Sequence, residues 1–170
     1  MADLTVCFFG HRRIDDWDAV EQKIFDLVGE LIRRHEYVDF LVGREGDFDQ
    51  IAASAIRRAK RYIFDANSSL VWVQPYQRAE YLRDPAAYER YYDRIEMCEA
   101  SESAYPKAAI QCRNRAMVDR SQLCVFYVTR DGGGAWQTMQ YAVRRQKAVI
   151  NLSEGSPDVI QYLLGNTGNT

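Results

Sequence analysis

The stretch that decides the fold runs from Cys112 to Asn151 and reads CRNRAMVDRSQLCVFYVTRDGGGAWQTMQYAVRRQKAVIN. Its middle, Leu123 to Val128, is an apolar run rich in β-branched and aromatic residues, which is typical of a buried parallel strand. A glycine turn follows, then a helix expected from about Ala135 to Gln146, and then a second apolar run at Ala148 to Leu152. This order predicts one strand–helix–strand unit.

The turn between that strand and that helix contains Gly132, Gly133 and Gly134. Glycines at the carboxyl end of a parallel strand let a ligand approach the backbone, and the next helix presents free N–H groups to an anion. We expect Trp136 and Thr138, just after the glycines, to lie beside such a ligand. Consecutive glycines can also make a tight turn and nothing more, so the turn alone leaves both interpretations open.

A second glycine-bearing loop follows an apolar run at Leu4 to Phe9 and contains Gly10, His11 and Arg12. An arginine there could form a bidentate pair of hydrogen bonds with a phosphate or a carboxylate. The alternative is a solvated turn with basic side chains. We favour a binding role because the loop follows the first strand of an α/β pattern.

A third such loop follows the apolar run Val38 to Val42 and contains Gly43, Glu45 and Gly46, with Asp49 just beyond them. A helix with small, apolar residues on one side comes next. Asp49 could cap that helix or bind a ribose hydroxyl, and capping is the commoner use of an aspartate at such a position.

With a further strand at Ser69 to Gln74, about five strands alternate with helices. The pattern predicts an α/β three-layer sandwich with a mostly parallel sheet of about five strands. In such sheets a ligand lies at the carboxyl edge, where the strand order reverses. If the first strand and the Leu123–Val128 strand are neighbours there, the first and last glycine loops flank one crevice.

The length of 170 residues predicts one domain, at 1–164, with a tyrosine-rich helical insert at 75–106 and a flexible tail at 165–170. A last short helix is expected at 157–164. The tyrosines of the insert could stack on a base as a lid. We favour their packing on the domain itself or on a second subunit, which makes a homo-oligomer plausible.

Composition bounds the function. The formal net charge is −2, which argues against nucleic acid as a partner. The four cysteines have no metal-ligand spacing, and we expect neither a metal site nor a bound cofactor. Neither a signal peptide nor an apolar run that could span a membrane is visible, so we expect a cytoplasmic protein without a membrane partner.

The segments CFFGHRRI, VGREGDFDQIAA, CRNRAMVDRSQLCVFYV and GGGAWQTMQYAVRRQKAVINL resemble the SLOG superfamily. That superfamily includes the DprA/Smf proteins, the Lonely-guy phosphoribohydrolases and the YpsA-like proteins. The likeness is greatest to the YpsA-like branch, with its TGHR-type first loop and GGTWQT-type later loop. It covers nearly the whole chain apart from the insert. The resemblance implies a Rossmann-like fold that binds nucleotides or nucleotide-derived ligands.

The chain also departs from the Lonely-guy pattern. Arg113 resembles the arginine of the Lonely-guy arginine–lysine pair, whereas Asn114 stands in place of the lysine. Past the glycines, the sequence AWQTMQ lacks the glutamate of those enzymes. Cleavage of an N-glycosidic bond needs a carboxylate to stabilise the cationic sugar or to position water. Glu45 or Asp49 would have to supply it, with Arg113 holding the phosphate.

Three functions therefore stay open. The first is a binding protein for a nucleotide or nucleotide derivative, which we favour. The second is a nucleoside-monophosphate N-glycosidase, with Arg113, Glu45 and Asp49 as its catalytic residues. The third is a DprA-like binder of single-stranded nucleic acid, for which the basic run Arg57, Arg58, Lys60 and Arg61 is a candidate contact, although such runs are usually solvated helix faces.

Overall fold

The computed structural model describes residues 2–155, so the expected helix at 157–164 and the tail at 165–170 lie outside the described residues. Within that range six parallel strands form one sheet: β1 (Leu4–Gly10), β2 (Val38–Val42), β3 (Ser68–Gln74), β4 (Arg94–Met97), β5 (Leu123–Tyr127) and β6 (Ala148–Asn151). The helices are α1 (Trp17–Arg34), α2 (Asp47–Tyr62), α3 (Ala79–Arg83), α4 (Pro85–Tyr91), α5 (Pro106–Arg120) and α6 (Gly133–Arg144). Short 3-10 turns lie at Glu99–Ser101 and Leu152–Glu154.

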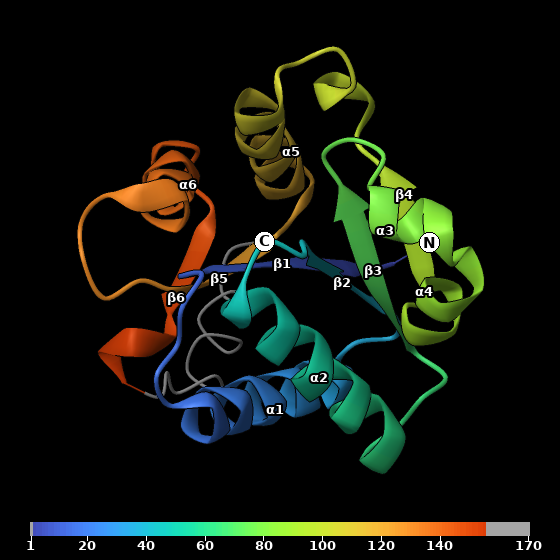
Figure 1. Cartoon of the computed structure of the whole chain (residues 1–170). Coiled ribbons are helices and arrows are strands. Elements are labelled where there is room, and N and C mark those ends of the chain that lie inside the picture. The colour runs from blue at the N-terminus through green and yellow to red at the C-terminus, as the bar shows by residue number, and fades with distance from the viewer. Residues whose placement is uncertain (1, 156–170) are drawn as a thin grey trace.

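The sheet has the order β4-β3-β2-β1-β5-β6. Strands β2 to β4 are added on one side of β1, and β5 and β6 on the other, so the strand order reverses between β1 and β5. The two strands are direct neighbours, with Gly10 opposite Tyr127 at their carboxyl ends. Helices α1 and α2 cover one face of the sheet, and α5 and α6 cover the other (Figure 1). This arrangement confirms the expected Rossmann-like α/β sandwich and the expected pairing at the reversal.

Each face of the sheet has its own apolar layer. Phe8, Phe40 and Trp72 belong to the layer under α1 and α2, and all three are fully buried. Phe9 and Phe126 stack in the layer under α5 and α6, with ring centroids 5.5 Å apart. Helix α1 forms because its apolar residues recur at helical spacing and so share one buried face: Val20, Ile24, Leu27, Val28 and Leu31.

The tyrosine-rich stretch at 75–106 differs from its expected form because it also contributes the edge strand β4, which pairs with β3. Tyr81, Tyr88 and Tyr92 pack around Trp72 with ring centroids 6.1, 5.4 and 5.4 Å from it. The aromatic rings therefore serve the core of their own domain. Whether the chain forms an oligomer stays a prediction.

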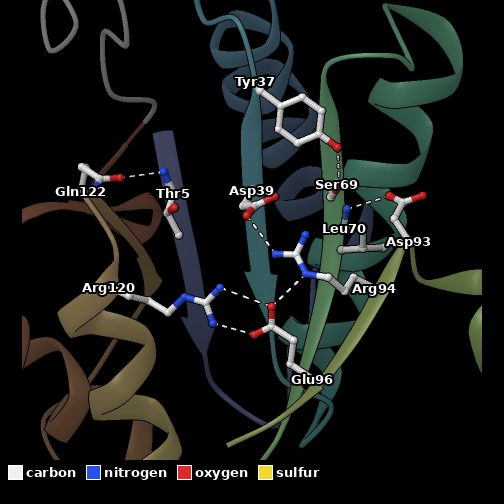
Figure 2. A network of polar contacts seen from close by, with 10 residues as sticks. All are labelled: Thr5, Tyr37, Asp39, Ser69, Leu70, Asp93, Arg94, Glu96, Arg120 and Gln122. Atoms are coloured by element: carbon white, nitrogen blue, oxygen red, sulfur yellow. Dashed lines mark hydrogen bonds and ion pairs between the residues drawn. The ribbon is translucent and has the colours of Figure 1, made fainter. Parts of the chain in front are cut away.

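A chain of ion pairs crosses the sheet from β2 and β4 to α5 (Figure 2). Arg94 contacts Asp39 at 2.9 Å and Glu96 at 2.8 Å, and Arg120 contacts the second oxygen of Glu96 at 2.6 Å. Partly exposed pairs contribute little one by one. Linked through Arg94 and Glu96, they fix the short strand β4 relative to the sheet and to α5.

Among residues 2–155, none of the helices has the length and apolar character that crossing a membrane requires. In the same part of the chain, no group of three or more His, Cys, Asp or Glu side chains is placed to hold a metal ion.

Candidate functional site

A cavity of about 490 Å³ lies at the carboxyl edge of the sheet, at the reversal between β1 and β5. Its volume is in the range that small-molecule sites occupy. Eleven of the predicted site residues line it: Gly10, His11, Arg12, Gly43, Glu45, Gly46, Asp49, Arg113, Asn114, Gly133 and Gly134. Gly132, Trp136 and Thr138 are not part of the lining. Residues that sequence reasoning did not single out complete it: Phe9, Lys107, Ile110, Gln111, Arg130, Ala135 and Gln137.

Two of the lining glycines are required by packing within the protein itself. A β-carbon on Gly10 would lie 2.2 Å from Cγ of Phe48, and one on Gly46 would lie 2.5 Å from Cα of Arg12. Both contacts hold the start of α2 against the loop that follows β1. From the sequence, glycine at these positions was explained by a ligand that approaches the backbone. The structure gives a second explanation, because other parts of the chain pack directly against both glycines.

The turn before α6 is different, because its glycines face open space. Gly132 and Gly133 have φ angles of +89° and +83°, a left-handed conformation that favours glycine. A β-carbon at either position would meet nothing within 4 Å. Gly133 and Gly134 also line the cavity, so the start of α6 and its free N–H groups lie where an anion could bind.

Arg113 lies at the inner end of the cavity and is only 2% exposed. Its Nη1 donates to the carbonyl oxygen of Val73 at 2.8 Å, its Nε donates to Oδ1 of Asn114 at 2.9 Å, and Nη1 lies 3.7 Å from Oε1 of Glu45. Burial lowers the pKa of Arg113, while the carboxylates of Asp49 and Glu45 oppose that shift. The guanidinium is therefore held in place by the protein before any ligand arrives.

Asn114 and Thr138 join α5 to the glycine turn. The side-chain amide of Asn114 donates to Oγ1 of Thr138 at 3.2 Å, and that hydroxyl donates to the carbonyl oxygen of Gly134 at 2.9 Å. Thr138 is 1% exposed, so it positions the turn instead of facing the cavity. Trp136 packs against the apolar layer under α5 and α6.

Glu45 and Asp49 bring two carboxyl groups to the inner end. Oδ2 of Asp49 accepts a hydrogen bond from the backbone N–H of Glu45 at 2.8 Å, just ahead of α2, which resembles the capping use expected for it. Burial raises the pKa of Asp49 to about 6, although that hydrogen bond and Arg113 oppose the shift. Glu45 forms an ion pair with Arg78, and its Oε1 is buried without a hydrogen-bond partner among the described residues.

Basic side chains surround the mouth of the cavity. Arg12, Lys107 and Arg130 line it and are all exposed to solvent. His11 is buried, and its Nε2 accepts a hydrogen bond from the backbone N–H of Thr129 at 2.9 Å, which ties the loops after β1 and β5 together. Burial, reinforced by nearby Arg130, lowers the pKa of His11. The mouth is thus cationic because of its arginines and lysine.

No protein-family model and no curated protein matches the sequence. Solved structures do match in their fold. One is a DNA processing protein A from Helicobacter pylori, described by its mode of binding single-stranded DNA, with a TM-score of 0.63 and 17% identity over 99% of this chain and 75% of that one. Another is the DNA processing protein A (DprA) from Streptococcus pneumoniae, with a TM-score of 0.58 and 14% identity over 96% of this chain and 56% of that one. The fold is DprA-like.

The same fold also matches a molybdenum cofactor binding protein from Rippkaea orientalis, with a TM-score of 0.62, 16% identity and 98% of both chains covered. At sequence identities this low, the likeness to these structures concerns the fold alone. A fold of this Rossmann-like kind is what the resemblance to the SLOG superfamily implied. The assignment to the YpsA-like branch stays a prediction.

These neighbours contradict the expectation that nucleic acid can be set aside as a partner, because one DprA-like structure is described by its binding of single-stranded DNA. The physical error lies in the use of net charge. The value of −2 is a sum over the whole chain, whereas the mouth of the cavity carries Arg12, Lys107 and Arg130, with no exposed acid among the described residues that line it.

Proposed function

We propose that this protein binds a nucleotide or nucleotide-derived ligand in the cavity between the ends of β1 and β5. The observation that carries the proposal is the division of the cavity into an exposed cationic mouth and a buried inner end that holds charged groups in fixed positions. Phosphate oxygens would contact Arg12, Arg130 and Lys107 and the open N-terminus of α6. The sugar and base would lie further in.

A second candidate, single-stranded nucleic acid, is favoured by the same mouth and by the DprA-like fold. Exposed cations along a groove are the usual means by which proteins follow a phosphate backbone. In this version one nucleotide of the strand would occupy the cavity, and its neighbours would run over the cationic mouth. The basic run on α2 does not line the cavity and is not a solvated helix face throughout. Lys60 is buried and donates to the carbonyl oxygen of Ser68 at 2.6 Å, and Arg58 pairs with Glu21 of α1 at 2.8 Å.

The hydrolase alternative has weaker support. Asp49 has the raised pKa that proton transfer at neutral pH requires. However, Arg113 already donates hydrogen bonds to Val73 and Asn114. In addition, the segment after the glycines lacks the glutamate of the Lonely-guy enzymes, and the residue of this segment that lines the cavity, Gln137, is neutral. We therefore keep binding as the proposed function, and we retain the YpsA-like branch as the finer family assignment.

Calorimetric titration with adenosine monophosphate and with a short oligonucleotide tests both candidates. We expect the double variant Arg12→Gln/Arg130→Gln to bind about tenfold or more weakly, because a hydrogen bond to a charged group contributes about 1.5–3 kcal/mol. Arg144→Gln, an exposed arginine at the other end of α6, serves as the matched control and should bind as the unaltered protein does. Equal affinity of the double variant, or no binding of either ligand to the unaltered protein, would overturn the proposal.

A further inference from the structure

A second cavity, of about 720 Å³, is larger than the one at the reversal of the sheet and is lined by α3, α4 and the first turns of α1 and α2. Four of its lining side chains are aromatic: Trp17, Tyr88, Tyr91 and Tyr92. Trp17 is 43% exposed, and Tyr88 and Tyr91 are half-buried. Ring surface that does not serve the protein's own core therefore borders this space, which we call the aromatic groove.

The charged side chains of the aromatic groove balance one another. Two arginines and two acids belong to its lining: Arg44, Arg83, Glu80 and Asp84. The guanidinium of Arg44 lies over the ring of Tyr88, 5.1 Å from its centroid, and donates from Nη1 to the hydroxyl of Tyr92 at 3.2 Å. With no net charge and with ring surface exposed, the groove favours a flat, uncharged group that can stack on an aromatic side chain.

Two loops that lie side by side connect the aromatic groove with the cavity at the sheet reversal. The loop after β2 gives Gly46 to the cavity and Arg44 to the groove. The loop after β1 gives Arg12 to the cavity and leads to Trp17 of the groove, five residues further and at most about 18 Å away. The N–H of Asp47 donates to the carbonyl oxygen of Arg12 at 2.9 Å and holds the loops together. An extended ligand that crosses them meets the exposed cation of Arg12 on its way.

A ligand that fits both spaces needs phosphates for the cationic mouth and flat, uncharged rings for the aromatic groove. Single-stranded nucleic acid has both, whereas a protein segment has rings without phosphates. We propose that the aromatic groove binds a base of a single strand whose neighbouring phosphates lie at the mouth of the cavity, with Trp17 and Tyr91 as the stacking surface. This inference rests on the single-strand form of the proposed function and deepens it, because it gives the strand a direction across the molecule.

Tryptophan fluorescence of the full chain tests the inference, with adenosine monophosphate and oligodeoxyadenylates of two to eight nucleotides as ligands. The longer oligonucleotides should bind more tightly than the monophosphate and should quench Trp17, because a base stacks on its ring. Trp17→Phe keeps a ring for stacking, so it should bind them with similar affinity but without that part of the quenching.

Trp17→Ala should weaken binding of the longer oligonucleotides about tenfold, because a stacked base loses its platform, and should leave binding of adenosine monophosphate unchanged. Anisotropy of labelled oligonucleotides measures the first affinity, and calorimetry measures the second. Phe64→Ala is the matched control, since Phe64 is 54% exposed and lines neither the groove nor the cavity. This control should bind both ligands as the unaltered protein does.

The outcomes are separable. If the monophosphate binds but longer oligonucleotides neither bind more tightly nor change the emission of Trp17, nucleotide binding stands and the inference is wrong. If affinity rises with length but Trp17→Ala has no effect, the strand leaves the cavity on another side and the inference is again wrong. If no ligand binds, both proposals fail. A melting curve of Trp17→Ala identifies loss of folding, and Tyr91→Ala, on α4 and outside both connecting loops, is then the second variant and should show the same selective loss.

Discussion

At the scale of single residues, Asp49 shows how surroundings change the chemistry of a common side chain. In the sequence it is an ordinary first-turn aspartate of a helix, and the structure preserves that use through its contact with the N–H of Glu45. Burial next to Glu45 then raises the pKa of Asp49 to about 6, against an ordinary value of 3.8. Its position relative to Arg113 arises only when α2 and α5 meet at the cavity.

The raised pKa of Asp49 predicts an effect on stability. Between pH 4 and 6 the folded protein binds more protons than the unfolded chain, so this group lowers the free energy of unfolding as the pH rises. Asp49→Asn should therefore match the unaltered protein near pH 4 and exceed its free energy of unfolding by up to about 3 kcal/mol at pH 7.5. Urea unfolding at several pH values measures this difference.

The companion variant Asp49→Ala removes the acceptor for the N–H of Glu45 as well as the charge. It should gain less stability than Asp49→Asn at pH 7.5, because a buried donor is left unpaired. A difference between Asp49→Asn and the unaltered protein that does not vary with pH would contradict the raised pKa.

At the scale of elements, the site depends on how the start of α2 docks onto the loop after β1. The backbone N–H of Asp47 donates to the carbonyl oxygen of Arg12 at 2.9 Å, and the N–H of Ile14 donates to Oδ2 of Asp47 at 2.9 Å. Phe48 fills the space beside Gly10, where no β-carbon fits. These contacts bring two loops that are far apart in the sequence into one wall of the cavity.

This docking predicts a difference between two glycines of the same cavity. Gly10→Ala places a carbon against the ring of Phe48, a fully buried side chain, and should cost about 1–3 kcal/mol of stability. Gly134→Ala meets only the end of the Gln111 side chain, at 3.1 Å, and lies in the first turn of α6. It should change the free energy of unfolding by less than about 1 kcal/mol. Chemical denaturation of both variants compares them, and equal losses would contradict the packing argument.

At the scale of the whole molecule, the distribution of charge matters more than its sum. A chain of net charge −2 places three exposed cations, Arg12, Lys107 and Arg130, around the cavity at the edge of the sheet where the strand order reverses. Elsewhere many charges are paired on the surface, as in the Asp39–Arg94–Glu96–Arg120 chain of Figure 2. The field that a polyanion meets at the cavity is therefore opposite in sign to the net charge.

Binding of a single-stranded oligonucleotide should therefore weaken as salt rises. If Arg12, Lys107 and Arg130 each neutralise one phosphate, the logarithm of the association constant should fall against the logarithm of salt concentration with a slope of about −2. Fluorescence anisotropy of a labelled oligonucleotide at several salt concentrations measures the slope. The double variant Arg12→Gln/Arg130→Gln should reduce it to less than half, and affinity that does not depend on salt would contradict contact with the phosphate backbone.

Much of the fold follows from local sequence patterns, because periodic burial is written into short stretches of chain. Five strands are apolar runs, the helices between them have apolar faces, and the alternation of the two predicts a parallel sheet. That β1 and β5 are neighbours, with the strand order reversing between them, was only a condition at the level of the sequence, and the structure decided it. The glycine loops at the carboxyl ends of β1, β2 and β5 follow from the same pattern, and so does their meeting at one edge. The strand β4 could not be found this way, because none of its four residues is buried and it contains no apolar run.

The parts of the site that depend on distant partners came only with the folded chain. Arg78 lies 33 residues from Glu45, in a stretch whose composition indicates aromatic packing, and no local pattern links the two. The sequence placed both Thr138 and Gly10 beside a ligand. In the structure Thr138 is buried and bonded to the glycine turn, and Gly10 makes room for the side chain of Phe48. Local periodicity specifies which face of an element is buried. Which side chains then share a cavity, and with what pKa, depends on the sheet order that brings the loops together.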